Sequence, residues 1–500
     1  MDDLQKYYGE KFTKVVPNDT DNWSSEKYAI LSHTVMSDVQ FEAHGDSDGC
    51  NVEINDEIEA GDKAAETHLI VKVCDAIMGS GKTESAITYM NSNPDQHFIY
   101  ITPYRDEARR IIASCPALNF TEPETEFTKK NNIPRSIYTQ TLVNQNRNIA
   151  STHQCFRFYK KELRELIKER HYTLIIDESV EILSRSKVKQ ADFQLLKDAG
   201  YITQDERGVY RATDKGAGYT GGAFDEALKT IREDDIIEIV DGNDKESCSF
   251  FWWCLSAELL RCFDDVIVLT YLFPSCSLHH LIEMNEIPYR YIGVSKTVGV
   301  FSFADSIEYI PEYTKHLGEM IDIFDNDRMN AVGNERFALS QNWFLRRDQK
   351  HMKEVTQLKK HIYNYFKRYC TDGPDARMWS TYSKAMRLIS GDGYTKKFLV
   401  FNKCATNDYS DRTWLAYCVN IYMNVGQKLY YKEHGIEADE DAYALSVMLQ
   451  WIWRSAIRNG EKIHIYIPSA RMRGLLRQWI ESVAAESQEE TQDETNATAA

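Results

Sequence analysis

The sequence predicts an α/β fold built from two blocks of parallel sheet. Short, uninterrupted apolar runs alternate with charged, helix-like segments from residue 71, and the same alternation resumes near residue 375. Parallel strands that are covered on both faces read as such continuous runs. The chain of 500 residues is long enough for two or three domains of about 150 residues each, and its 43% hydrophobic content can fill their cores.

The first block is expected to span residues 69–295. Its strand candidates are the apolar runs at 69–75, 98–101, 174–176 and 266–269, and the charged segment 105–113 reads as a helix. Residues 185–250 interrupt the pattern and are rich in Gly, Asp and Lys. Within this insertion, 191–211 reads as a helix followed by a hairpin. A surface excursion is favoured here over a small winged-helix-like domain.

The second block is expected over residues 296–482. A more helical segment at 300–372 precedes strand candidates at 398–401 and 463–467, and a helix at 470–480 closes the block. The two ends of the chain differ from both blocks in composition. Residues 1–68 form a polar, acidic segment, and residues 483–500 are a low-complexity tract that is expected to be disordered.

The formal charge of −17 at first argues against a nucleic-acid partner. Residues 1–70 hold 16 acidic and 5 basic residues, however, and residues 481–500 hold 6 acidic and no basic residues, so 71–480 carry 54 charges of each sign. Basic residues cluster locally at 346–368 and 454–477. Two interpretations of these clusters stay open, namely a track for a phosphate backbone and solvated helix faces.

Eleven cysteines are scattered without a C-x-x-C pair, which favours free thiols of a reducing compartment over a disulfide framework or a zinc site. The first residues lack the basic and apolar regions of a signal peptide, and no run approaches 18 apolar residues. We therefore expect a soluble cytoplasmic protein without a membrane partner.

The strongest chemical signal is the run A-I-M-G-S-G-K-T at 76–83, which follows a strand candidate and precedes a helical segment. Glycines let the backbone wind tightly and aim its N–H groups at phosphate oxygens, and the helix that follows adds its positive end. A lysine neutralises the β- and γ-phosphates, and a threonine hydroxyl binds Mg²⁺. The alternative is a glycine-rich turn with an exposed lysine. The residues expected to bind the nucleotide are Gly79, Ser80, Gly81, Lys82 and Thr83.

An acidic pair, Asp177 and Glu178, comes directly after the apolar run 174–176. Ligands bind at the carboxyl ends of parallel strands, where these two carboxylates would lie. We expect Asp177 to hold Mg²⁺ together with Thr83, and Glu178 to polarise the attacking water. An ordinary helix N-terminus is the alternative interpretation of the pair.

A third segment, at 450–458, contains Gln450, Arg454 and Arg458. If it is helical, the two arginines lie on successive turns of one face. From there they could reach across a cleft to the transferred phosphoryl group. The alternative is a surface helix with two solvated arginines.

Together these segments resemble motifs I, II and VI of the DEAD-like superfamily 2 helicases encoded by bacteriophages. Motif I begins with Ala76 where the general pattern has glycine. The resemblance covers about residues 71–480 and implies two tandem RecA-like domains, ATP and Mg²⁺ as cofactors, and an arginine finger. The two arginines of 450–458 are four residues apart rather than the usual three, so either one could be the finger. The residues to which the resemblance assigns catalysis are Lys82, Asp177, Glu178, Gln450, Arg454 and Arg458.

Weaker similarities extend the resemblance to nucleic-acid contacts. The segment 102–110 is similar to motif Ia, 151–153 to the backbone-contacting segment before motif II, and 269–271 occupies the place of motif III. The segments 379–382 and 405–409 are similar to motifs IV and V. The implied partner is nucleic acid, DNA in preference to RNA, with replication proteins as further partners. The residues implied to contact it are Thr102, Pro103, Tyr104, Thr152 and Thr406.

Three functions fit these motifs. The leading hypothesis is an ATP-dependent helicase or translocase that acts in phage DNA replication or recombination. A DNA-packaging ATPase, the terminase large subunit, would need a nuclease domain with several acidic residues, whereas the second block carries the Gln/Arg segment. A nucleotide-regulated nucleic-acid-binding module without unwinding activity would share all of these motifs.

Overall fold

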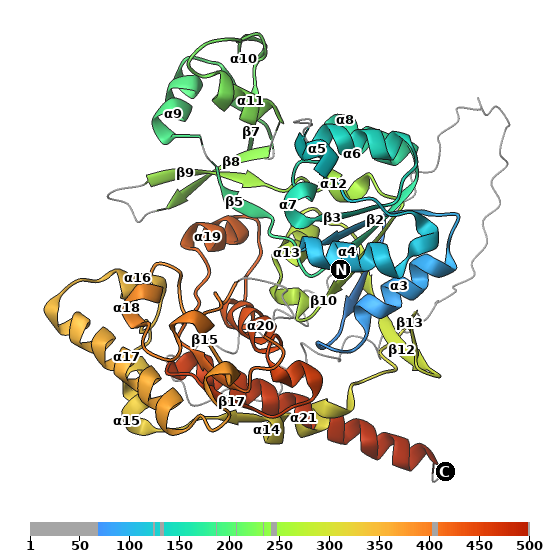
Figure 1. Ribbon diagram of the computed structural model, residues 1–500. Helices are drawn as coiled ribbons and strands as arrows, with labels where there is room; N and C mark the ends of the chain where they lie inside the picture. Colours follow the sequence, from blue (N-terminus) through green and yellow to red (C-terminus); the bar gives the residue numbers. More distant parts are fainter. Residues whose placement is uncertain are drawn as a thin grey trace, which may run out of the picture.

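The computed structural model shows two parallel sheets, each covered by helices, and a smaller antiparallel sheet inserted in the first domain (Figure 1). The acidic segment expected at 1–68 lies outside the described residues. The structure describes residues 69–123, 126–130, 135–186, 188–206, 208–233, 235–241, 248–402 and 409–498.

The first domain is built on a six-stranded parallel sheet with the order β11-β1-β10-β4-β2-β3. Its strands are β1 (Val71–Asp75), β2 (His97–Thr102), β3 (Ile149–Thr152), β4 (Tyr172–Asp177), β10 (Asp265–Thr270) and β11 (Tyr289–Tyr291). The larger helices that cover it are α3 (Lys82–Ser92), α4 (Arg105–Ser114), α6 (Arg135–Asn144), α8 (Lys161–Glu169) and α13 (Ser277–Met284). The four predicted strands and the helix at 105–113 are confirmed, while β3 and β11 were not predicted.

Both faces of this sheet are buried, which explains the continuous apolar runs of its strands. In β4, Leu174 and Ile176 join one hydrophobic cluster, and Ile175 joins the cluster on the opposite face. Successive side chains of a strand point to opposite faces, so a strand that is buried on both sides needs an apolar residue at every position.

A hairpin of β12 (Gly293–Thr297) and β13 (Val300–Ala304) also belongs to the first domain. Phe303 packs its ring 5.9 Å from that of Tyr89 in α3. The predicted boundary between residues 295 and 296 therefore falls inside β12. The prediction of a helical segment from residue 300 is wrong for the hairpin, because the alternation of Val300–Ala304 has the period of a strand.

The insertion is a five-stranded antiparallel sheet with the order β5-β9-β8-β7-β6. Its elements are β5 (Leu183–Arg185), α9 (Gln190–Asp198), β6 (Ile202–Gln204), β7 (Val209–Ala212), α10 (Asp214–Ala217), α11 (Asp225–Glu233), β8 (Asp235–Asp241) and β9 (Cys248–Cys254). The helix and hairpin predicted within 191–211 are confirmed. The expected surface excursion is wrong, because Phe193, Tyr210 and Phe251 are buried and pack their rings on one another.

The second domain contains a four-stranded parallel sheet with the order β14-β17-β16-β15. The strands are β14 (Ile321–Ile323), β15 (Arg377–Ser380), β16 (Trp414–Tyr417) and β17 (Ile463–Tyr466), and the long helices are α17 (Gln349–Arg368), α20 (Glu440–Ile452) and α21 (Ala470–Thr498). The strand at 463–467 is confirmed. The strand predicted at 398–401 is wrong, because this run forms only an isolated bridge between Phe398 and Trp379 and is apolar because Leu399 is buried.

Helix α21 continues through residues 483–498, where a disordered tail was expected. Ala, Glu and Gln are strong helix formers, so the composition that indicated low complexity also favours a helix. Figure 1 shows the last turns of α21 extending away from the body of the second domain.

The second domain contacts the insertion through α19 (Val425–Glu433). The Tyr430 hydroxyl lies 3.8 Å from Cys254 Sγ in β9, and Tyr431 joins the hydrophobic cluster of the first domain. A Cβ atom on Gly426 would lie 3.4 Å from the side chains of Ile239 and Trp252. The insertion is thus packed against both domains.

Two expectations about the whole chain can be compared with its described part. Across that part, no helix is both long and apolar enough to cross a bilayer. The cysteines whose side chains are described are free thiols, and all but Cys370 are buried.

Candidate active site

Residues 76–83, the predicted phosphate loop and called the phosphate loop below, join the end of β1 to the start of α3. Gly79 and Gly81 have φ angles of 79° and 88°, in the left-handed region that favours glycine. A Cβ atom on Gly81 would lie 2.2 Å from the Phe301 ring. Ser80 is buried, and its hydroxyl has no hydrogen-bond partner among the described residues. The loop therefore offers a tight turn and an unused polar group, as a phosphate cradle requires.

Lys82 and Thr83 face the centre of this site. The Lys82 ammonium donates to the carbonyl oxygen of Ala76 and, at 3.0 Å, to that of Ile77. Desolvation lowers the pKa of Lys82, although the nearby Cys74, Asp177, Asp75 and Glu178 partly offset this by raising it. Thr83 Oγ1 donates to Asp177 Oδ2 at 3.3 Å. The sheet thus brings the phosphate loop and the acidic pair together, although 94 residues separate them.

The acidic pair lies at the carboxyl end of β4. Desolvation raises the pKa of Asp177, and a hydrogen bond from Tyr100 and the charge of Lys82 oppose the rise. Glu178 has a φ of 61°, and its N–H donates to the Leu269 oxygen at 2.9 Å. Such a conformation is uncommon for a residue other than glycine and is characteristic of functional sites. A threonine hydroxyl beside a carboxylate is an oxygen donor set that suits Mg²⁺.

Two residues support Asp177: Tyr100 was not singled out from the sequence, and His153 was noted only within the segment 151–153 that is similar to a backbone-contacting motif. The Tyr100 hydroxyl donates to Asp177 Oδ2 at 2.7 Å, and His153 Nε2 lies 2.9 Å from the Asp177 backbone oxygen. Desolvation lowers the pKa of His153 to about 4, so its ring is neutral at physiological pH. The only sequence signal for Tyr100 was that a polar hydroxyl lies within the apolar run of β2. Its contact with Asp177 depends on the order of the strands in the sheet, which the sequence does not give.

The segment 450–458 is not one continuous helix, so the expectation that both arginines share a helix face is wrong. Helix α20 ends at Ile452, and Arg458 lies in the short 3₁₀ helix Ala456–Asn459. Arg454 is 7% exposed, and its charge opposes the desolvation that raises the pKa of Glu178. Arg458 is exposed. The structure therefore buries Arg454 near enough for its charge to act on Glu178 and leaves the Arg458 side chain exposed.

A cleft of about 1380 Å³ lies between the two domains. Glu178 and Gln450 line it from opposite domains, together with Pro103 and Tyr104 of the segment similar to motif Ia. Thr102 is fully buried at the end of β2 instead of lining the cleft. Thr152 is half-buried and accepts a hydrogen bond from the Cys155 N–H, and Thr406 lies outside the described residues. The basic residues that line the cleft are Arg157, Arg336, Arg346 and Lys428.

Aromatic side chains flank the phosphate loop. Phe301 lies against Gly81, and the Tyr313 hydroxyl donates to the Met78 oxygen. The ring of Tyr313 lies 6.2 Å from that of Trp453, which is buried next to Arg454 in the sequence. Trp451 is also buried, and its Nε1–H donates to the Leu399 oxygen at 3.0 Å. Phe301 and Tyr313 were not found from the sequence because no spacing relates them to the loop.

The basic cluster 454–477 is largely structural. Arg471 pairs with Asp441 at 2.7 Å, and Arg477 pairs with Asp325 at 2.8 Å. Arg473 donates to the oxygens of Ile467 and Pro468. Cations that are engaged in this way have less capacity to bind a phosphate backbone.

Comparison with known proteins gives the family of this chain. Residues 315–480 match the family described as the YonV C-terminal Rossmann-like domain. The chain is 34% identical over 415 residues to the SPbeta prophage-derived protein YonV of Bacillus subtilis (strain 168), with 82% of this chain and 99% of YonV covered. The chain belongs to the YonV family. Its α/β class and its parallel-sheet domains agree with the fold predicted from the sequence.

Solved structures of helicases resemble the fold at low sequence identity. An XPD helicase matches with a TM-score of 0.43 and 11% identity, covering 82% of this chain and 95% of its own. S. tokodaii Xpd4 matches with a TM-score of 0.39 and 12% identity, covering 81% and 92%. The DUF1998 helicase MrfA, bound to DNA and AMPPNP, matches with a TM-score of 0.29 and 10% identity, covering 80% and 46%.

Proposed function

We propose that this protein hydrolyses ATP and uses the reaction to move a nucleic-acid strand through the cleft between its two domains. The observation that carries the proposal is the convergence of three segments on one site. The phosphate loop with Thr83, the acidic pair of Asp177 and Glu178, and Arg454 of the second domain meet there. Each supplies a group that phosphoryl transfer to water requires.

The residues divide the work as follows. Lys82 leaves the two carbonyl oxygens that it contacts and binds the β- and γ-phosphates, which the backbone of 79–81 cradles. Thr83 and Asp177 would hold Mg²⁺, which would supply positive charge to the phosphate oxygens. Glu178 orients the attacking water and accepts its proton, and the raised pKa of this carboxylate suits a base.

Arg454 makes the reaction depend on the arrangement of the domains. It follows α20 in the second domain, whereas Glu178 follows β4 in the first. A change in the distance between the domains therefore changes the positive charge at the transferred phosphoryl group. Tyr104 and Gln450 line the same cleft as Glu178, so a strand bound there can sense the state of the nucleotide.

The setting that we propose is phage DNA replication or recombination, with DNA as the preferred nucleic acid. Support comes from the prophage origin of the YonV relative. A binding module that hydrolyses ATP without unwinding remains the second candidate, since the same site serves both functions.

The test is an ATPase assay with single-stranded DNA, duplex DNA and RNA as stimulants, followed by a strand-displacement assay. Wild-type protein should be stimulated by nucleic acid. Lys82→Ala should lose nucleotide binding, and Glu178→Gln should bind ATP without turning it over. Retained turnover in Lys82→Ala would refute the phosphate-loop assignment, and stimulation without strand displacement would favour translocation or the binding module.

A further inference from the structure

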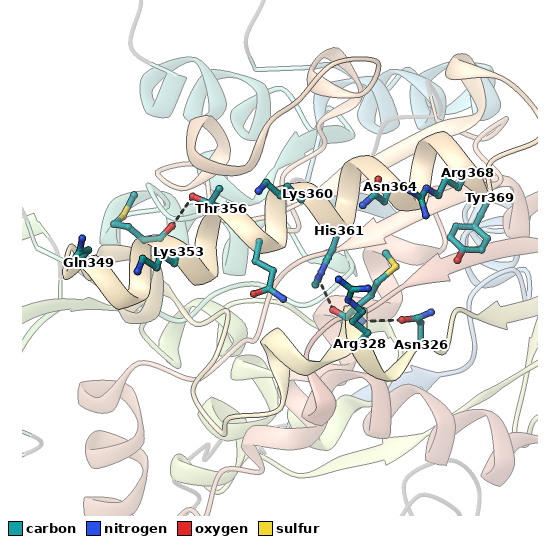
Figure 2. Close-up of a pocket in the computed structure, with 13 residues that line it drawn as sticks. Asn326, Arg328, Gln349, Lys353, Thr356, Lys360, His361, Asn364, Arg368 and Tyr369 are labelled. Atoms are coloured by element: carbon teal, nitrogen blue, oxygen red, sulfur yellow. Dashed lines mark hydrogen bonds between the residues drawn. The ribbon is translucent and has the colours of Figure 1, made fainter.

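A second basic surface lies on the second domain, outside the cleft. It is a groove of about 810 Å³ between α17 and the short helix α15 (Asp327–Asn330) (Figure 2). The α17 side presents Lys353, Lys360 and Arg368, and Arg328 lies on the α15 side. His361 joins the two sides, because its Nδ1 lies 3.1 Å from the Met329 oxygen.

The spacing of residues in α17 explains why these side chains share one face. Lys353, Lys360, Asn364 and Arg368 recur at intervals of seven, four and four residues, and a helix turns once in about 3.6 residues. The opposite face of α17 carries Val355, Leu358 and Ile362, which are buried in the domain core. The helix is therefore amphipathic, and its groove face is polar and basic.

The lining of the groove holds cations without a carboxylate among them. Among the thirteen described residues that line it there is no carboxylate. No described carboxylate forms an ion pair with Arg328, Lys353, Lys360 or Arg368, whereas Arg346 and His351 near the start of α17 do have carboxylate neighbours. Amide groups of Asn326, Gln349, Gln357 and Asn364 line the same groove and add neutral hydrogen-bonding capacity.

The groove begins close to the cleft along the chain. Arg346 lines the cleft, and Gln349, three residues later, lines the groove. Helix α17 has 20 residues and is therefore about 30 Å long at about 1.5 Å per residue. The first turn of α17, where the groove begins, thus follows three residues after a side chain that lines the cleft.

We propose that this groove binds the phosphate backbone of the nucleic-acid strand that enters or leaves the cleft. The inference rests on the proposed function for the identity of the strand, but it assigns a separate site. Lysine and arginine without carboxylate partners attract a polyanion, and a row of cations along one helix follows an extended backbone. Cations and amides make up most of the groove lining, with Tyr369 at one end, so contact there should be mainly with the sugar–phosphate backbone, which carries no sequence information.

The experiment compares two double variants of the full chain with the same change in charge. Lys353→Ala/Lys360→Ala removes two cations from the groove. Lys359→Ala/Lys367→Ala removes two exposed cations of α17 that do not line it. Affinity for single-stranded oligonucleotides of increasing length is measured between 50 and 200 mM salt. A short oligonucleotide that fills only the cleft is the internal reference.

The groove variant should lower the slope of log affinity against log salt by about 1.4, since each phosphate contact of a single strand contributes about 0.7. The wild-type advantage over this variant should then shrink about sevenfold between 50 and 200 mM salt. The control variant should keep the wild-type slope, and the short oligonucleotide should bind all three proteins equally.

Equal slopes for the groove variant and the wild type would overturn the proposal. An acidic protein segment would then be the favoured ligand of the groove. An equal loss in both variants would also overturn it, because the effect would then come from net charge. If the wild type binds no oligonucleotide at all, the proposed function fails together with this inference. If the wild type binds oligonucleotides and the groove variant binds them with the same salt slope, the inference alone fails.

Discussion

Replacing Tyr100 by phenylalanine should shift the pH dependence of ATP hydrolysis without changing the residues that touch the nucleotide. Tyr100 is fully buried in β2, and its hydroxyl donates to Asp177 Oδ2 at 2.7 Å. This bond is the largest of the influences that oppose the desolvation of Asp177. Its loss raises the pKa of Asp177 further, so the carboxylate takes up a proton at a higher pH. Activity that needs ionised Asp177 is therefore lost earlier as the pH falls.

The magnitude follows from the kind of bond that is removed. A hydrogen bond to a charged group contributes about 1.5–3 kcal/mol. Since about 1.36 kcal/mol corresponds to a factor of ten, the rate of Tyr100→Phe on the acidic side of the profile should fall about 10- to 150-fold at a given pH. At alkaline pH, where Asp177 is ionised in both proteins, the rates should converge.

The assay is a pH–rate profile of nucleic-acid-stimulated ATPase activity. Tyr172→Phe is the matched control. Tyr172 lies in the same sheet, and its hydroxyl donates at 2.9 Å to the backbone carbonyl oxygen of Arg147, which carries no charge. The control should lose stability like Tyr100→Phe but keep the wild-type profile. Coincident profiles for wild type and Tyr100→Phe would refute the reasoning, and so would an equal shift in the control.

Three further predictions concern other parts of the molecule. Arg454→Ala should lower the turnover number about 10³-fold or more while ATP still binds, whereas Arg458→Ala should change turnover little. Rapid-mix kinetics measure the turnover, and a nucleotide-binding assay shows whether ATP still binds. Burial lowers the pKa of His280 to about 4, so the unfolded chain takes up a proton near pH 6.5 that the folded protein refuses. The free energy of unfolding of the wild type should therefore fall between pH 7.5 and 5.5 by about 1.3 kcal/mol more than that of His280→Leu, as measured by denaturant titration. The same fall with pH in both proteins would contradict this. Phe193→Ala should destabilise the insertion by about 3–5 kcal/mol, seen as earlier proteolysis of residues 183–254, and unchanged cleavage would speak against a packed insertion.

The sequence predicted those local structures that depend on neighbouring residues alone, namely the strand, turn and helix around residues 76–83 and the strand that ends at the acidic pair. The glycines of the phosphate loop and the acidic pair after an apolar run could be recognised because each needs its own neighbours only. Arg454 and Arg458 could not be separated in this way. The Ala456 N–H donates to the Arg412 oxygen at 3.0 Å, and this long-range contact lies where the chain has left the helical path of α20. Sequence periodicity alone predicts that the helix continues through residue 458.

Strand order explains most of what remained hidden. Tyr100 reaches Asp177 because β2 lies directly beside β4, with Tyr100 opposite Ile175. Phe301 reaches the phosphate loop because the hairpin of β12 and β13 packs on α3. The insertion resembled a polar excursion because its core residues come from strands that are far apart in the sequence, such as Tyr210 in β7 and Phe251 in β9.

The contact between α19 and the insertion limits how the molecule can change shape. The insertion leaves the first domain at β5 and returns at β9, and these two strands pair with each other, so it is held at both ends by one ladder. Helix α19 presses on the same sheet while the residues just before and within it line the cleft. The two domains are therefore connected through this sheet as well as through the chain after the hairpin and the contacts beside residues 76–83. Widening of the cleft would require α19 to slide across the sheet or the β5–β9 ladder to bend, so the insertion resists separation of the two domains.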